Sequence, residues 1–342
     1  MSDDQEYGRY GRPQTDGTPP VPPGMPFGLP EGGRDTHPVA AEALQVHDEA
    51  DESDGTMDAG DARLPIALFI ITVFTTLWAG AYATKTSPLT GAWEFLIEDP
   101  WVLLKGIPFA ATLLGILVTH EFGHYLFSRL HRVPASLPLF IPGPPHFIGT
   151  FGAIIRMRGP IQDRRALFDI GVSGPIAGFV VAVAALGVGL SLSNIVLAQN
   201  TYGLHLGEPL LLQAMAWLIL GPLPDGYDVV LHPIAFAGWF GLFVTSLNLI
   251  PIGQLDGGHV AYALWGDRQR TMALSVVPVL LLLGFVGWPG WFIWVGLAGL
   301  IGLAHPPVRD QKAVLGRTRI WVGWLAVGIF VVSFAPVPFS IG

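Results

Sequence analysis

The sequence has no cysteine and few charged residues. The absence of cysteine excludes disulfides and thiolate metal sites, so any metal ion would have to be bound by His, Asp or Glu. Charged residues make up 13% of the 342 positions, whereas soluble domains carry about 25%. Hydrophobic residues make up 51%, and the mean hydropathy is +0.51. We therefore predict an all-α polytopic membrane protein that interacts with the lipid bilayer and not with nucleic acid.

The acidic charge is concentrated near the N-terminus. Residues 1–63 hold 14 acidic and 4 basic residues, whereas the other 279 residues hold 12 acidic and 14 basic ones. The first segment is also rich in proline and glycine and cannot bury enough apolar surface to fold. We predict a disordered cytoplasmic tail over 1–63 and a transmembrane domain over 64–342. Because the first residues are acidic and not apolar, we expect no cleavable signal peptide.

Long apolar stretches predict about seven transmembrane helices. They cover residues 64–84, 103–130, 167–192, 232–249, 271–287, 289–304 and 318–338. A further apolar stretch at 209–220 is too short to span easily, so we expect it to be interfacial or re-entrant. Of the 18 Lys and Arg residues, only Lys85 and Lys105 fall on one side of this arrangement. The other side is therefore predicted to be cytoplasmic, together with the N-terminus.

The second of these stretches contains the run His120-Glu121-Phe122-Gly123-His124. Positions i and i+4 share a face of a helix, so the two histidines can hold one zinc ion. The glutamate between them can then act as general base toward a zinc-activated water. Ionisable residues inside a membrane are costly, which points to a functional site.

A third zinc ligand must come from elsewhere, because catalytic zinc usually takes three protein ligands. Residues 125–162 contain no Asp or Glu. The strongest candidate is Asp256, which follows the fourth apolar stretch among helix-breaking prolines and glycines, where we expect an interrupted helix. The predicted orientation puts His124 and Asp256 at the same depth, nearer the cytoplasmic face.

These two motifs together resemble those of the site-2 proteases, which are intramembrane zinc metalloproteases. The second motif is Asn248-Leu249-Ile250-Pro251 followed by Leu255-Asp256-Gly257, and the resemblance covers about 103–265. The run Gly149-Thr150-Phe151-Gly152-Ala153 is most similar to chloroplast and bacterial members. No connection is long enough to hold the PDZ domain of many bacterial members.

The resemblance implies a three-helix catalytic core with a short re-entrant β-element. It also implies a transmembrane protein substrate, whose peptide bonds are hydrolysed in or near its transmembrane segments. It implies one Zn2+ ion per chain, held by His120, His124 and Asp256, with Glu121 as the base. The residues it implies for substrate binding are Asn248, Pro251, Gly149, Phe151 and Gly152.

Some residues leave alternatives open. His259 stands where many members have arginine; we expect it to face water, although it could compete for zinc or hydrogen-bond Asp256. Asp169 is interpreted as a boundary or packing residue. The small residues of 173–178 indicate close helix packing or substrate contact. We expect His305 to be interfacial and the last three spans to be scaffold. The other functions considered are a catalytically silent relative that binds or escorts membrane proteins, and a metal transporter.

Overall fold

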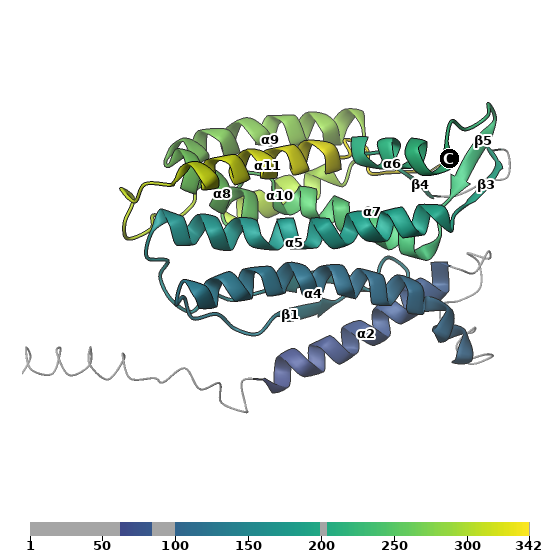
Figure 1. The fold of residues 1–342 in the computed structure, drawn as a ribbon, viewed down its shortest axis with the longest axis horizontal. Helices are drawn as coiled ribbons and strands as arrows, with labels where there is room; N and C mark the ends of the chain where they lie inside the picture. Colours follow the sequence, from purple (N-terminus) through teal and green to yellow (C-terminus); the bar gives the residue numbers. More distant parts are fainter. Residues whose placement is uncertain (1–61, 84–99, 199–203, 342) are drawn as a thin grey trace, which may run out of the picture. The chain divides into compact units, whose positions relative to one another are not determined.

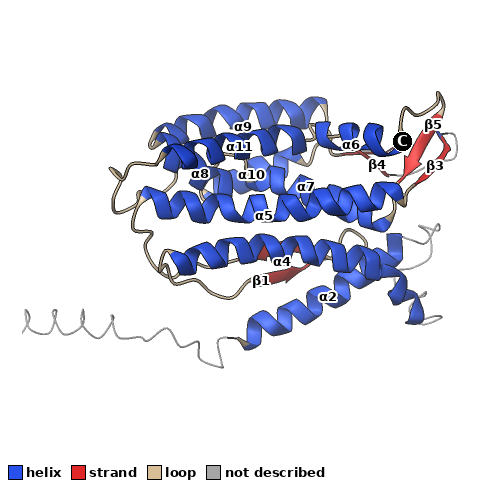
Figure 2. Cartoon of the chain, viewed as in Figure 1, coloured by secondary structure: helices blue, strands red, loops and turns tan. Residues whose placement is uncertain are grey.

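The computed structural model describes residues 62–83, 100–198 and 204–341, so the predicted tail lies almost entirely outside the described residues. The described chain is mainly helical (Figures 1 and 2). Its helices are α2 (Arg63–Ala83), η1 (Pro100–Gly106), α4 (Ile107–Leu130), α5 (Arg164–Ser191), α6 (Leu210–Leu220), α7 (Pro233–Asn248), α8 (Asp256–Trp265), α9 (Arg268–Val286), α10 (Trp291–Ile301) and α11 (Arg317–Ser333). Its strands are β1 (Leu139–Pro142), β2 (Thr150–Ile154), β3 (Asn194–Leu197), β4 (Leu204–Leu206), β5 (Tyr227–Val230) and β6 (Phe339–Ile341).

Four helices of the described part are long and apolar enough to cross a membrane: α2, η1 with α4, α5 and α9. Each lies within a few residues of a predicted span. The spans predicted over 232–249 and 289–304 correspond to the shorter apolar helices α7 and α10. The mainly helical class is thus confirmed, and the four candidate spans are consistent with a polytopic membrane protein. The number of seven spans stays a prediction.

Helices α4, α5 and α7 pack against one another and form the centre of the molecule (Figure 1). Small residues allow this close packing. A Cβ added at Gly238 of α7 would lie 2.7 Å from the backbone nitrogen of Leu186 in α5, and one added at Gly189 would overlap Ala235 of α7. Helices in a membrane associate mainly through such packing, since lipid is as apolar as their side chains.

The chain leaves helical geometry between α7 and α8, as the sequence predicted. Helix α7 ends at Asn248 and α8 begins at Asp256, which places this aspartate in the first turn of a new helix. A side chain at Gly257 would overlap the Leu249 carbonyl, so the start of α8 lies directly against the residue that follows α7. Glycine is therefore required there by space.

Strands β1 and β2 form an antiparallel hairpin, with Phe140 opposite Ala153. The predicted β-element is therefore present as a strand pair, and its re-entrant position in a membrane stays a prediction. The pairs β3–β5 and β4–β6 were not predicted. The β-branched residues Ile195, Val196, Val229 and Val230 were the available signal for the first of them.

Candidate metal centre

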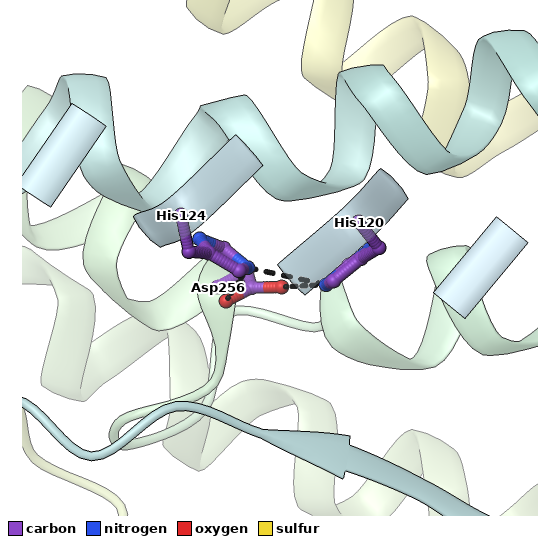
Figure 3. A group of neighbouring side chains, drawn as sticks. All are labelled: His120, His124 and Asp256. Carbon is purple, nitrogen blue, oxygen red and sulfur yellow. Dashed lines mark hydrogen bonds and ion pairs between the residues drawn. The ribbon is translucent and has the colours of Figure 1, made fainter. Parts of the chain in front are cut away.

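The side chains of His120, His124 and Asp256 converge on one point (Figure 3). His120 Nε2 lies 3.1 Å from His124 Nε2 and 3.2 Å from Asp256 Oδ2. His124 Nε2 lies 3.3 Å from Asp256 Oδ1. The two histidines come from successive turns of α4, and the aspartate comes from the first turn of α8. Residues 132 positions apart in sequence thus share one buried cluster.

This donor set fits a zinc ion. Zinc bonds of about 2.0–2.1 Å in tetrahedral geometry place neighbouring ligand atoms about 3.3 Å apart. The three interatomic distances of 3.1, 3.2 and 3.3 Å match this spacing. These distances join four electron-rich atoms, because His120 approaches Oδ2 of Asp256 and His124 approaches Oδ1. Such atoms repel one another at this range, so the arrangement favours a bound cation. Two imidazoles and one carboxylate leave a fourth zinc position for water.

The tautomer of His124 is set by helix α5. His124 Nδ1 lies 2.7 Å from the carbonyl oxygen of Ile170, which can only accept a hydrogen bond. Nδ1 therefore carries the proton, and the lone pair of Nε2 faces His120 and Asp256. Metal-binding histidines commonly have such a partner, which fixes the orientation of the ring.

The small residues of α5 face the metal centre. A Cβ added at Gly178 would lie 3.1 Å from the His120 ring, and one at Gly174 would overlap His124 Nε2. A Cβ at Gly171 would lie 2.7 Å from the Cβ of His259. These glycines share one face of α5 because they are spaced by three and four residues. The sequence predicts close helix packing or substrate contact for the small residues of 173–178. The structure shows close packing at Gly174 and Gly178.

Glu121 and Asn248 lie beside the ligands. Glu121 directly follows His120 on α4 and is only 5% exposed. It interacts electrostatically with His124 and Asp256. Asn248 is the last residue of α7, and its Nδ2 lies 3.4 Å from His120 Nε2. Both residues therefore border the centre, one on the ligand-bearing helix and one at the end of the neighbouring helix.

The other residues predicted to bind substrate lie in two places. Gly149 lies directly before β2 and Gly152 lies within it, and both have positive φ angles, of 77° and 103°. Phe151 is 67% exposed. Pro251 instead lies in the α7–α8 turn, where its carbonyl accepts a hydrogen bond from Gln269.

The expectation that His259 faces water is wrong. His259 and His305 are both buried, and His259 Nδ1 lies 2.7 Å from His305 Nε2. Burial lowers the pKa of both, to about 3 for His259. His305 Nδ1 donates to the Pro306 carbonyl, so its Nε2 accepts the proton of His259 Nδ1. His305 is therefore not interfacial. Through this hydrogen bond the segment after α10 is joined to α8.

Gln269 is a buried structural residue that the sequence did not point to. Its Nε2 donates to the carbonyls of Pro251 and Leu303, and its Oε1 accepts from the backbone N–H of His305. Its side chain is almost fully buried. It therefore joins the turn before Asp256 to the segment after α10.

We expect Gln269→Leu to leave the Pro251 carbonyl and the His305 N–H unpaired, whereas the Leu303 carbonyl still accepts from the Gly253 N–H. The loss should destabilise the protein by about 3 kcal/mol, since an unpaired buried group costs about 1–3 kcal/mol. Thermal unfolding in detergent measures the change. Gln213→Leu is the control, because its amide donates to the Glu208 carbonyl at an exposed position. Equal melting temperatures for wild type and Gln269→Leu would contradict this role.

Comparison with known proteins agrees with this geometry. Residues 108–286 match the model of "Peptidase family M50". The chain is 33% identical over 222 residues to "Probable zinc metalloprotease EGY1, chloroplastic" of Oryza sativa subsp. japonica, covering 59% of this chain and 38% of that protein. It is 36% identical over 180 residues to the protein of that name from Arabidopsis thaliana, covering 51% of this chain and 32% of that protein. It is 32% identical over 188 residues to "Probable zinc metalloprotease EGY2, chloroplastic" of Arabidopsis thaliana, covering 54% of this chain and 33% of that protein.

The aligned part is thus only about a third of the length of these relatives. No solved structure matches the chain. The family match nevertheless covers more than half of the chain and contains His120, His124 and Asp256. The chain therefore belongs to peptidase family M50, the site-2 proteases.

Proposed function

We propose that this protein is an intramembrane zinc metalloendopeptidase that hydrolyses peptide bonds in or near transmembrane segments of other proteins. The observation that carries the proposal is the convergence of His120, His124 and Asp256, with Glu121 buried beside them. The zinc metalloprotease names of its relatives support the same chemistry.

In this mechanism His120, His124 and Asp256 would hold one zinc ion per chain. A bound zinc ion supplies Lewis acidity, which activates a water and polarises the scissile carbonyl. Glu121 accepts a proton from the attacking water and then passes it to the leaving amine. Its low exposure keeps other water away from the proton transfer. Asn248, beside His120, is placed to donate to the substrate backbone.

The hairpin supplies a surface for the substrate. The peptide bonds of a transmembrane helix are internally hydrogen-bonded, so the helix must unwind before hydrolysis. Strand β2 pairs only with β1 among the described strands, which leaves it one unpaired edge. We propose that an extended substrate segment pairs with this edge. Exposed Phe151 and the open space beside Gly152 are consistent with contact there.

The proposed topology has seven transmembrane helices, a cytoplasmic N-terminus and a metal centre nearer the cytoplasmic face. Lys and Arg residues support this orientation, because they gather at the connections that follow α4 and precede α5 and α11. The proposed tail over 1–63 would then be cytoplasmic.

Cleavage in a reconstituted membrane tests the proposal. The purified full-length chain and a tagged single-span membrane protein are placed in the same liposomes, and the products are sequenced by mass spectrometry. We expect cleavage within or next to the span, lost on chelation and restored by zinc. A zinc-loaded chain that binds such spans but cleaves none of a varied set would instead favour the silent relative.

Asp256→Ala tests the metal ligands. We expect the zinc content of the purified chain to fall from about one ion to below about 0.2, because two histidines alone hold zinc poorly. Elemental analysis after dialysis measures it. Asp228→Ala in β5 is the control, since Asp228 bonds only its own neighbour's backbone N–H among the described contacts. Unchanged zinc content in Asp256→Ala would remove Asp256 from the ligand set.

A further inference from the structure

Asp169 lies at a junction of three helices. Arg319, at the start of α11, donates to it from Nε to Oδ1 over 2.8 Å and from Nη2 to Oδ2 over 2.7 Å. His131, which follows the last turn of α4, donates from Nε2 to Oδ2 over 2.8 Å. Asp169 itself belongs to α5. One carboxylate thus ties the ends of α4 and α11 to α5.

These contacts are more than a loose surface ion pair. Exposed pairs contribute little to stability, because water screens them and long side chains lose entropy. The side chain of Asp169 is only 15% exposed, and both of its oxygens are occupied by a paired guanidinium. Such two-point arginine–carboxylate contacts are strong and directional. The position of this part of α5 is therefore well defined.

The next residue reaches the metal centre. The carbonyl of Ile170 accepts the hydrogen bond from His124 Nδ1 and a second one from Ser173 Oγ, over 2.7 and 2.9 Å. Pro175 lies within α5 and has no N–H, so the Gly171 carbonyl lacks its usual helical partner. Helix α5 therefore lacks one internal hydrogen bond next to the Ile170 carbonyl, and contacts from outside α5 add to what holds this carbonyl in place.

We infer that Asp169 is a positioning residue of the metal centre: with Arg319 and His131 it holds the Ile170 carbonyl against His124. Arg319 lies beyond the family-matched residues 108–286. Helix α11 is then more than the scaffold that the sequence suggested. The inference rests on the proposed metal centre and not on proteolysis.

Zinc affinity tests the inference on the purified full-length chain, by competition with a chelator of known affinity. We expect Asp169→Asn and Arg319→Gln each to weaken zinc binding by about 10–100-fold, as for other outer contacts of metal ligands. The double variant should lose no more than the stronger single variant, since both remove the same contact. With Co2+ in place of zinc, the visible absorption bands should shift in both single variants.

Arg165→Gln is the matched control. Arg165 also joins the first turn of α5 to the segment before α11, by donating to the Val314 carbonyl, but its side chain makes no hydrogen bond or ion pair with Asp169 in the described structure. We expect its zinc affinity and cobalt spectrum to be those of the wild type. An equal loss in Arg165→Gln would mean a general loosening of α5 and would overturn the inference.

Other outcomes are also decisive. Wild-type zinc affinity in Asp169→Asn or in Arg319→Gln would overturn the inference and leave the proposed function standing. If Asp169→Asn does not fold, Arg319→Gln and His131→Gln decide by the same measurements. A wild-type chain that binds no zinc would overturn the proposed metal centre and this inference together.

Discussion

Replacing Glu121 with glutamine is expected to abolish proteolysis while leaving zinc bound. The amide has nearly the shape of the carboxylate but cannot accept a proton at neutral pH. Proton transfer by a positioned side chain contributes about 10²–10⁴-fold to a rate, so we expect cleavage to fall by at least about 100-fold. Zinc content should stay near one ion per chain, because His120, His124 and Asp256 are unchanged. Product formation in liposomes and elemental analysis measure the two quantities.

Glu208→Gln is the control for this variant, since Glu208 is exposed and lies ahead of α6. Its cleavage rate should equal that of the wild type. A Glu121→Gln chain that cleaves at the wild-type rate would disprove the proposed base. A chain that loses zinc as well as cleavage would instead assign Glu121 a role in holding the centre together, since the substitution leaves the three proposed ligands intact.

The residues of the centre could be predicted because each is conspicuous in its surroundings. Two histidines and a glutamate stand within one apolar run, and an aspartate follows a second apolar run among prolines and glycines. Ionisable residues inside a membrane cost free energy, so their presence points to a function. The interrupted helix before Asp256 was predictable for a related reason, since Pro251 and Gly253 disfavour helix. The family resemblance then joined two motifs that are far apart in sequence.

The contacts around the centre could not be predicted in the same way. The Ile170 carbonyl that orients His124 is a backbone group, and every residue has one. The pairings of His259 with His305 and of Asp169 with Arg319 depend on how α8, α10 and α11 pack. Sequence periodicity gives the face of a helix but not its partner. The pairs β3–β5 and β4–β6 were missed because each strand is only three or four residues long.

Gly174 gives the second large effect, because its position excludes any side chain. A Cβ built on it overlaps Nε2 of His124, the atom that faces His120 and Asp256. Helices α4 and α5 are close here on both sides, since a Cβ at Gly123 of α4 would lie 2.8 Å from the Ser173 carbonyl. The helices cannot move apart at this point without disturbing the rest of their interface. The imidazole would have to move instead, and its bond to Ile170 would break.

We expect Gly174→Ala to weaken zinc binding by more than about 100-fold, beyond the 10–100-fold of a lost outer contact, and to abolish cleavage. Alanine is about 1 kcal/mol more favourable than glycine inside a helix, so weaker helix formation would not explain the loss. Gly178→Ala should have a smaller effect, about tenfold, because its Cβ would lie 3.1 Å from the His120 ring and needs only a small shift. Chelator competition measures both variants.

Gly187→Ala is the matched control on the same helix, since the nearest atom to its Cβ would be Met215 Cε at an ordinary 3.4 Å. Its zinc affinity should equal that of the wild type. The three glycines thus predict an order of loss, with Gly174 first, Gly178 second and Gly187 unaffected, which follows their distance from the histidine rings. Equal effects at all three positions would indicate general damage to α5. Wild-type zinc affinity in Gly174→Ala would contradict the assignment of His124 Nε2, at its position against Gly174, as a zinc ligand.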